Sequence, residues 1–215
     1  MAADSEARLP LRPLARAFFA RATLEVARDL IGCLLVHDSD DGTTVGSIVE
    51  AEAYGTGDPG SHAFRGKTER NAPMFEAPGR AYVYFTYGMH FCLNAVTDRD
   101  EVAGAVLIRA VEPLEGIDLM RARRGAVKDR DLARGPGRLT QAFGIGRPQN
   151  RADLTRPPLY ICAGERLPYR AVESTPRIGL GTVQDGRKWR FAVKGSPWVS
   201  RGPMTITMAK GSRRS

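Results

Sequence analysis

The stretch CLLVHDSDDGTTVGSIVEAEAY, residues 33–54, decides the fold because it contains two extended runs that meet at a turn. Residues 33–37 form a short apolar run, and residues 43–54 form a longer one that is rich in β-branched residues. The dipeptide Asp41-Gly42 between them is a strong signal for a two-residue hairpin connection. We therefore predict an antiparallel hairpin that joins a short strand to a long one.

The rest of the chain adds more strands than helices. A helix with Thr23 as its N-cap is predicted through Ile31, and helical periodicity returns after Pro113 and at residues 139–143. Further strands are predicted at residues 81–87, 90–96, 105–111, 159–162 and 189–193. This pattern predicts an α+β fold with a mostly antiparallel sheet and flanking helices.

One domain accounts for nearly the whole chain. No linker between residues 13 and 201 is long enough to separate two cores, so we predict a single domain over residues 13–201. Residues 1–12 are expected to form a flexible N-terminus, and residues 202–215 a basic C-terminal tail. No apolar run approaches the roughly 20 residues of a membrane span, and the N-terminus does not resemble a signal peptide. We expect a soluble cytoplasmic protein with no membrane partner.

The charge of the chain suggests a polyanionic partner. Its 215 residues include 32 Lys and Arg against 24 Asp and Glu, which gives a net charge of +8. Nucleic acid would satisfy this excess, although Arg-rich proteins also occur without such a partner. Seven basic residues are concentrated in residues 118–138, where they form either phosphate contacts or a solvated face.

Cysteine and histidine give no sign of a metal site. The three cysteines lie far apart within apolar strings, which indicates small core residues in a reducing compartment. The three histidines have no partner at the spacing of metal ligands. We therefore predict no structural zinc site.

The long strand carries an unusual polar face. Successive side chains of a strand point to opposite faces, so Val49, Ala51 and Ala53 would share one face. The other face would carry Ile48, Glu50, Glu52 and Tyr54. Two carboxylates and a phenol on one face either meet solvent or line a cleft, where they could form a general base or a metal site.

A second unusual segment is YVYFTYGMHFCLN, residues 82–94. Tyr87-Gly88 lies where the chain must reverse, so Tyr87 is expected at the exposed tip of a protruding hairpin. Aromatic residues in strands often serve packing alone, but a protruding ring on a basic protein also suits a wedge between stacked bases. In the apolar run of residues 105–111, Arg109 needs a carboxylate or ligand partner, and Glu52 is the obvious candidate.

Long motifs of the chain resemble those of the alkyladenine (3-methyladenine) DNA glycosylase family, which is found in animals and many bacteria. The similar segments cover residues 14–200 and include IVEAEAY (48–54), SHAFRGKTERNAPMF (61–75), GRAYVYFTYGMHFCLN (79–94), LIRAVEPLEG (107–116), DLARGPGRLTQAFGI (131–145), RIGLG (177–181) and RFAVKGSPWVS (190–200). The resemblance implies a single domain with a curved sheet. It also implies a monomeric enzyme that binds double-stranded DNA containing damaged purines.

The resemblance assigns roles to eight residues. Glu52 would be the general base that deprotonates the water attacking C1′, while Glu50 receives no catalytic role. Arg109 would help hold that water or a neighbouring phosphate, and the main-chain carbonyl of Ile178 would complete the water site. Tyr54 and Tyr84 would stack on the two faces of the flipped base, and His62 would hydrogen-bond its edge. Asn94 would exclude the exocyclic amino group of normal guanine. Tyr87 would occupy the space that the flipped base leaves in the duplex.

The implied reaction is hydrolysis of the N-glycosidic bond of alkylated or deaminated purines after base flipping. The lesions would include 3-methyladenine, 7-methylguanine, hypoxanthine and ethenoadenine. The product would be an abasic site, with no lyase activity and no cofactor. Two alternatives stay open: a non-catalytic protein that binds distorted DNA, and a metal-dependent nuclease that uses Glu50 and Glu52.

Overall fold

The hairpin of residues 33–54 lies at the centre of the sheet. Strand β1 (Leu34–Ser39) pairs antiparallel with β2 (Gly42–Tyr54), and Ser39 lies opposite Gly42. The turn is therefore Asp40-Asp41, one residue earlier than predicted. Gly42 opens β2 at φ 130°, a conformation that favours glycine, so it serves as the first paired residue rather than as part of the turn.

The computed structural model describes residues 11–200 except residues 182, 184 and 185. Nearly all of the expected N-terminal segment and the whole expected basic tail lie outside the described residues. Among the residues described, no helix combines the length and apolar character needed to cross a membrane.

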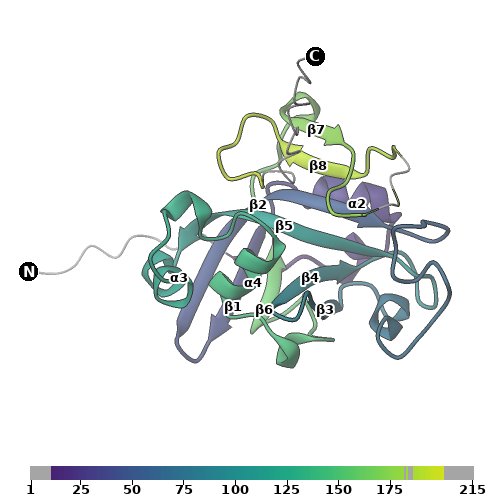
Figure 1. Ribbon diagram of the computed structural model, residues 1–215, viewed down its shortest axis with the longest axis horizontal. Coiled ribbons are helices and arrows are strands. Elements are labelled where there is room, and N and C mark those ends of the chain that lie inside the picture. The colour runs from purple at the N-terminus through teal and green to yellow at the C-terminus, as the bar shows by residue number, and fades with distance from the viewer. Residues whose placement is uncertain (1–10, 182, 184–185, 201–215) are drawn as a thin grey trace, which may run out of the picture.

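One curled antiparallel sheet contains all eight strands of the described chain (Figure 1). Its main path runs β3-β4-β5-β2-β1-β6, while β8 pairs with β2 and β7 pairs with β8. The strands other than the central hairpin are β3 (Ala81–Thr86), β4 (His90–Val96), β5 (Ala105–Glu115), β6 (Leu159–Cys162), β7 (Val172–Thr175) and β8 (Arg190–Val193). The predicted α+β class and antiparallel pairing are confirmed.

Four α-helices flank the sheet: α1 (Arg16–Phe19), α2 (Thr23–Asp29), α3 (Ile117–Arg124) and α4 (Pro136–Phe143). Helix α2 contacts β2 and β5, and α4 crosses in front of β4 and β5 in Figure 1. Short 3₁₀ turns lie at Ala72–Phe75, Asp129–Asp131, Arg147–Gln149 and Tyr169–Ala171. The N-terminus of α4 thus reaches the part of the sheet where β4 and β5 meet.

Among the differences from the predicted elements, two boundaries and one missed strand have a clear physical reason. Thr23 is the first residue of α2 rather than its cap, because its hydroxyl bonds the Thr97 hydroxyl at 2.9 Å instead of the helix backbone. Strand β5 continues through Pro113 to Glu115, at an irregularity in its pairing with β2. Strand β7 was not predicted, because four half-exposed residues carry little hydrophobic pattern.

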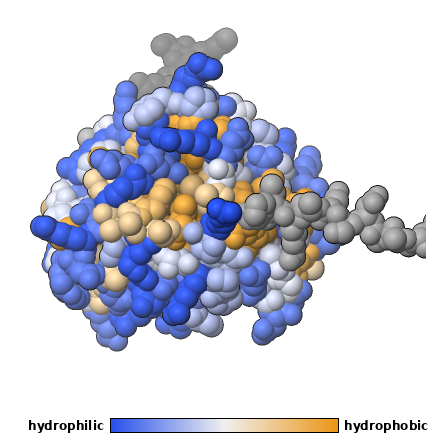
Figure 2. Space-filling model, turned by 180° about the vertical axis from the view of Figure 1, so that it is seen from behind, coloured by the Kyte–Doolittle hydropathy of each residue, from blue (hydrophilic) through white to orange (hydrophobic). Residues whose placement is uncertain are grey.

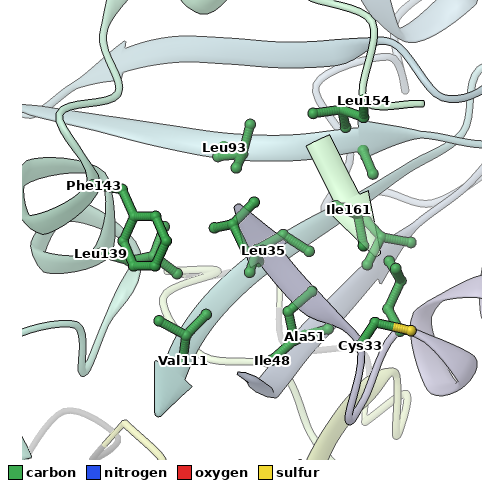
Figure 3. Close-up of a cluster of buried hydrophobic side chains, with 14 of the residues drawn as sticks. Cys33, Leu35, Ile48, Ala51, Leu93, Val111, Leu139, Phe143, Leu154 and Ile161 are labelled. Atoms are coloured by element: carbon green, nitrogen blue, oxygen red, sulfur yellow. The ribbon is translucent and has the colours of Figure 1, made fainter. Parts of the chain in front are cut away.

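A bulge in β2 separates the core face from the polar face. The register with β5 shifts between Ile48 and Glu50, so Ile48 joins Ala51 and Ala53 in the main core, contrary to the predicted alternation (Figure 3). Residues of α2 and α4 pack into the same core, including Val26, Leu139 and Phe143. The bulge leaves Glu50, Glu52 and Tyr54 outside this core cluster.

The three cysteines are free and buried, as predicted. Burial raises the pKa of Cys33 to about 12 and that of Cys162 to about 11, so both thiols stay protonated. Figure 2, the view from behind, shows a mostly hydrophilic surface with an apolar area near its centre.

Candidate active site

A cavity of about 300 Å³ opens beside the polar face of β2. This volume lies at the lower end of the range for small-molecule sites, roughly 300–1,000 Å³. Seven of the eight predicted site residues line it: Tyr54, His62, Tyr84, Tyr87, Asn94, Arg109 and Ile178. The eighth, Glu52, is fully buried and is hydrogen-bonded to three of them.

Glu52 is held by three donors from three different segments. Its Oε2 accepts hydrogen bonds from the Tyr54 hydroxyl at 2.8 Å and from Nη1 of Arg109 at 3.1 Å, and its Oε1 accepts one from the Ile178 amide at 2.7 Å. A carboxylate offers about four acceptor positions, so one remains for a water or ligand. Burial, together with Glu52, raises the pKa of Tyr54 well above its usual range, so this hydroxyl stays a donor.

Ile178 contributes its backbone to the site, as the resemblance implies, but through a different group. Its N–H donates to Glu52. The expected role of its carbonyl in holding water therefore stays a prediction.

Arg109 lies between the two glutamates of β2. Its Nε donates to Oε1 of Glu50 at 2.9 Å, while its Nη1 donates to Glu52. Burial by itself would lower the pKa of Arg109, but the two carboxylates raise it, so the guanidinium stays charged. The carboxylate partner expected for Arg109 is confirmed, and a second one, Glu50, accompanies it.

An aromatic wall forms one side of the cavity. The rings of His62 and Tyr84 meet edge to face with centroids 4.6 Å apart, and the rings of Tyr82 and Tyr84 lie 5.2 Å apart. The Tyr82 hydroxyl lies 2.9 Å from Nδ1 of His62, so it orients the imidazole and leaves Nε2 for a ligand. Sequence reasoning missed Tyr82 because a tyrosine in an apolar strand fits core packing equally well.

His62 stands at the open rim of the cavity, accessible to solvent. The surrounding protein nevertheless removes part of its hydration, and this desolvation, with the nearby Arg70 cation, lowers the pKa of His62. The imidazole is therefore neutral near pH 7.

Asn94 enters the cavity from β4, directly opposite Tyr82 of β3. Its Nδ2 donates to the Tyr82 carbonyl at 3.0 Å. Because the amide nitrogen is used in this way, the amide oxygen is the group of Asn94 that is left for the cavity.

Tyr87 occupies the exposed tip of the β3–β4 hairpin, as predicted, with 81% of its surface accessible. Both Tyr87 and Gly88 have positive φ, 51° and 67°, and the Met89 amide donates to the Thr86 carbonyl at 3.3 Å. A tyrosine in the left-handed region is strained. The tight turn therefore projects a large ring into solvent at the edge of the cavity.

A buried ion pair supports the opposite wall. Arg177 makes two hydrogen bonds to Asp58, and its guanidinium lies over the rings of Tyr54 and Trp189, 4.6 and 5.2 Å from their centroids. Because Arg177 directly precedes Ile178, the pair fixes both Tyr54 and the amide that binds Glu52. Sequence reasoning did not assign it a role, and its only signal was the first letter of RIGLG.

A second, basic cavity of about 400 Å³ adjoins the first and shares Arg109 and Pro136 with it. Three arginines, Arg130, Arg134 and Arg138, line it around a single carboxylate, Asp131, with nitrogen–oxygen distances of 3.3–3.8 Å. The local positive charge thus exceeds what Asp131 can balance.

The donor set around Glu50 and Glu52 is unsuited to a divalent cation. Arg109 bridges the two carboxylates, and Glu50 also accepts from Arg190 and Ser200. A metal ion there would be placed against a guanidinium, which electrostatic repulsion opposes. Within the described part of the chain, no group of three or more His, Cys, Asp or Glu residues is arranged to hold a metal ion.

Comparison with known proteins identifies the family of the chain. Residues 17–197 match the family model described as methylpurine-DNA glycosylase. A protein of Carboxydothermus hydrogenoformans named "Putative 3-methyladenine DNA glycosylase" is 47% identical over 189 residues, which is 87% of this chain and 98% of that relative. Proteins with the same name from Methanoculleus marisnigri and Burkholderia orbicola are 48% and 50% identical, covering 87% and 86% of this chain and 98% and 89% of the relatives.

The family model spans every residue that lines the aromatic cavity, and each of the three relatives covers at least 86% of the chain. The chain therefore belongs to the methylpurine-DNA glycosylase family.

Proposed function

We propose that this DNA glycosylase hydrolyses the N-glycosidic bond of alkylated or deaminated purines that are flipped out of duplex DNA. The lesions are 3-methyladenine, 7-methylguanine, hypoxanthine and ethenoadenine. The observation that carries the proposal is the carboxylate of Glu52, which is held by Tyr54, Arg109 and Ile178 at the edge of an aromatic cavity. The products are a free base and an abasic site in an uncut strand.

The cavity suits a flat, electron-poor ring system. Tyr54 and Tyr84 line it and would stack on the two faces of the base, while Nε2 of His62 would bind its edge. Alkylation at N3 or N7 makes a purine cationic, and aromatic faces attract cations. Asn94 would border the base and leave too little space for the exocyclic amino group of guanine.

Glu52 has two roles in the proposed reaction. As the bond between C1′ and the base breaks, its electrons leave with the base and positive charge develops on the sugar, which the carboxylate stabilises. A water bound at the remaining acceptor position of Glu52 adds its oxygen to C1′ and transfers its proton to the carboxylate. Arg109 orients the carboxylate throughout.

The DNA partner is recognised chiefly through its phosphates. Extrusion of a nucleotide costs a few kcal/mol, least for damaged or mispaired bases, so weak pairing contributes to selection. Tyr87 would fill the vacated place in the stack, and the basic cavity around Arg138 would contact the backbone beside the flipped nucleotide. One molecule presents all of these groups, so we propose that it acts as a monomer on chromosomal DNA.

Single-turnover release of free base from duplexes that each carry one of the four lesions tests the proposal. Glu52→Gln is expected to bind the lesion duplex with unchanged affinity and to release base at least 100-fold more slowly, the usual range for a lost general base. A Glu52→Gln protein that releases base at the wild-type rate would overturn the role of Glu52.

The two alternatives make different predictions in the same assay. A metal-dependent nuclease would lose activity in excess chelator and would cut the strand, whereas the proposed enzyme releases base in chelator without strand scission. A non-catalytic binder would release no base from any of the four duplexes while still binding them.

A further inference from the structure

Glu50 is more completely surrounded by donors than any other group described around the site. It is fully buried on β2, opposite Ala110 of β5 and Ala192 of β8. Its Oε1 accepts hydrogen bonds from Nε of Arg190 at 2.6 Å, from the Ser200 hydroxyl at 2.8 Å and from Nε of Arg109 at 2.9 Å. Its Oε2 accepts the Ser200 amide at 2.6 Å. With four donors, this carboxylate has little capacity left for substrate.

Arg109 connects Glu50 to the reaction. The same guanidinium donates Nε to Glu50 and Nη1 to Glu52, and its Nη2 lies 3.3 Å from the Ser200 hydroxyl. The contact with Glu50 fixes the guanidinium from the side, so that only one of its nitrogens reaches Glu52. A guanidinium without this restraint could turn to form a two-pronged pair with Glu52, the arrangement that Arg and carboxylate prefer.

The charges in this cluster balance. Two arginines, Arg109 and Arg190, face two carboxylates, Glu50 and Glu52, and Arg190 lies directly across from Glu52 in the sheet. Burial alone would raise the pKa of Glu50, but Arg109 and Arg190 lower it, so Glu50 is ionised. The other titratable or charged groups that surround Glu52 are Tyr54, Cys92 and the Arg177–Asp58 pair.

We propose that Glu50 is a positioning residue: it holds Arg109 side-on and offsets the positive charges of Arg109 and Arg190, so that these charges do not weaken Glu52 as a base. Arg190 and Ser200 take part in the same positioning, because their hydrogen bonds connect β8 and the chain after it to Glu50. This inference rests on the function proposed above and adds to it a residue that does not touch the substrate.

The test follows the pH dependence of single-turnover base release from a duplex carrying 7-methylguanine. This base is already cationic, so its protonation does not contribute to the acid limb of the profile. The protein is kept in saturating excess, so that a change in affinity caused by His62 does not contribute either. Glu50→Gln leaves two arginines facing Glu52, which is expected to move the acid limb down by about one pH unit. The plateau rate should also fall about tenfold, because Glu52 becomes a weaker base.

Two further variants separate charge from geometry. Glu50→Asp keeps the charge but shortens the side chain, so the acid limb should stay in place while the plateau falls. The double variant Glu50→Gln/Arg190→Gln removes one charge of each sign, and its limb should return toward the wild-type position. If thermal melting shows that Glu50→Gln does not fold, Arg190→Gln replaces it. Because this change removes a positive charge near Glu52, it is expected to move the acid limb to higher pH.

The outcomes distinguish this inference from the proposed function. Slower base release by Glu50→Gln with an unmoved acid limb would mean a purely structural role and would overturn the inference, as would an unmoved limb in Arg190→Gln. If wild-type protein releases no base, or Glu52→Gln releases it normally, the proposed function itself fails.

Discussion

Tyr54 combines two functions at the residue scale. Its hydroxyl orients Glu52, while its ring lines the cavity and is covered by the guanidinium of Arg177. The hydroxyl cannot ionise near neutral pH, because burial and the neighbouring carboxylate raise its pKa. A single side chain thus links the proposed general base to the proposed stacking of the base.

The protonation of His62 is a testable property of one residue. Partial desolvation and the Arg70 cation lower its pKa, so an NMR titration should give a midpoint below the ordinary value of about 6.5. Arg70→Gln removes a nearby positive charge and should raise the midpoint. Arg65→Gln, an equal change in an exposed arginine of the same loop, serves as the control and should leave it unmoved.

The consequence for binding has a definite sign. Above its lowered pKa, His62 is neutral and can pair one ring nitrogen with Tyr82 and the other with the base. Below it, both nitrogens become donors, so affinity for the lesion duplex should change only at pH values under about 6.5. A His62 midpoint above that value would contradict the assigned environment.

At the scale of elements, one substitution in the β3–β4 hairpin is expected to increase the stability of the protein and to weaken its binding to DNA. Tyr87 has a φ of 51°, which costs of order 1 kcal/mol for a tyrosine and little for asparagine. Tyr87→Asn is therefore expected to raise the free energy of unfolding by up to about 1 kcal/mol in denaturant titrations. The same change should weaken binding to a lesion duplex by about 1–3 kcal/mol, the usual loss of one stacked ring.

Two controls accompany the hairpin experiment. Tyr87→Phe keeps the ring and should bind the lesion duplex as the wild type does. Tyr169→Ala removes another exposed tyrosine, in a cavity that shares no residue with the site, and should leave binding unchanged. Equal affinity of Tyr87→Asn and wild-type protein would exclude the wedge.

The sequence predicts the elements well where side-chain pattern and turn chemistry agree. Strands β4 and β6 begin and end at the predicted residues, and the β3–β4 turn lies where Tyr87-Gly88 indicates. The bulge at Ile48–Glu50 was not predictable, because it follows from pairing with β5, which one strand's alternation does not contain. Strand β7 was missed for a similar reason, since it exists by virtue of its pairing with β8.

The candidate site was likewise predictable where local sequence pattern carries the information, and not where contacts between distant segments decide. Strand parity placed Glu50, Glu52 and Tyr54 together, and the family resemblance added residues from three other segments. Neither source indicated the Arg177–Asp58 pair, whose members lie 119 positions apart in the chain. Such contacts depend on tertiary packing between the segment after β7 and the loop after β2, on which local pattern carries no information.

At the scale of the whole molecule, the proposed function assigns affinity for DNA and specificity for damage to different residues. The mainly aromatic cavity is the proposed site of the base, whereas the adjoining basic cavity is lined by one aspartate and four arginines, one of which is the shared Arg109. Phosphate contacts are independent of sequence and of damage. Changes in the basic cavity should therefore alter binding to every duplex equally, and changes in the aromatic cavity should alter binding only to damaged ones.

The salt dependence of duplex binding measures how much the basic cavity contributes to affinity. The logarithm of the binding constant falls by about 0.9 per logarithmic unit of salt for each phosphate neutralised, so Arg138→Gln should reduce the slope by about 0.9. The reduction should be the same for damaged and undamaged duplexes, which leaves their affinity ratio unchanged. Arg156→Gln removes an equal charge from an exposed arginine that does not line the basic cavity, and its slope should match the wild type. Equal slopes for Arg138→Gln and Arg156→Gln would mean that net charge alone, and not the basic cavity, holds the DNA.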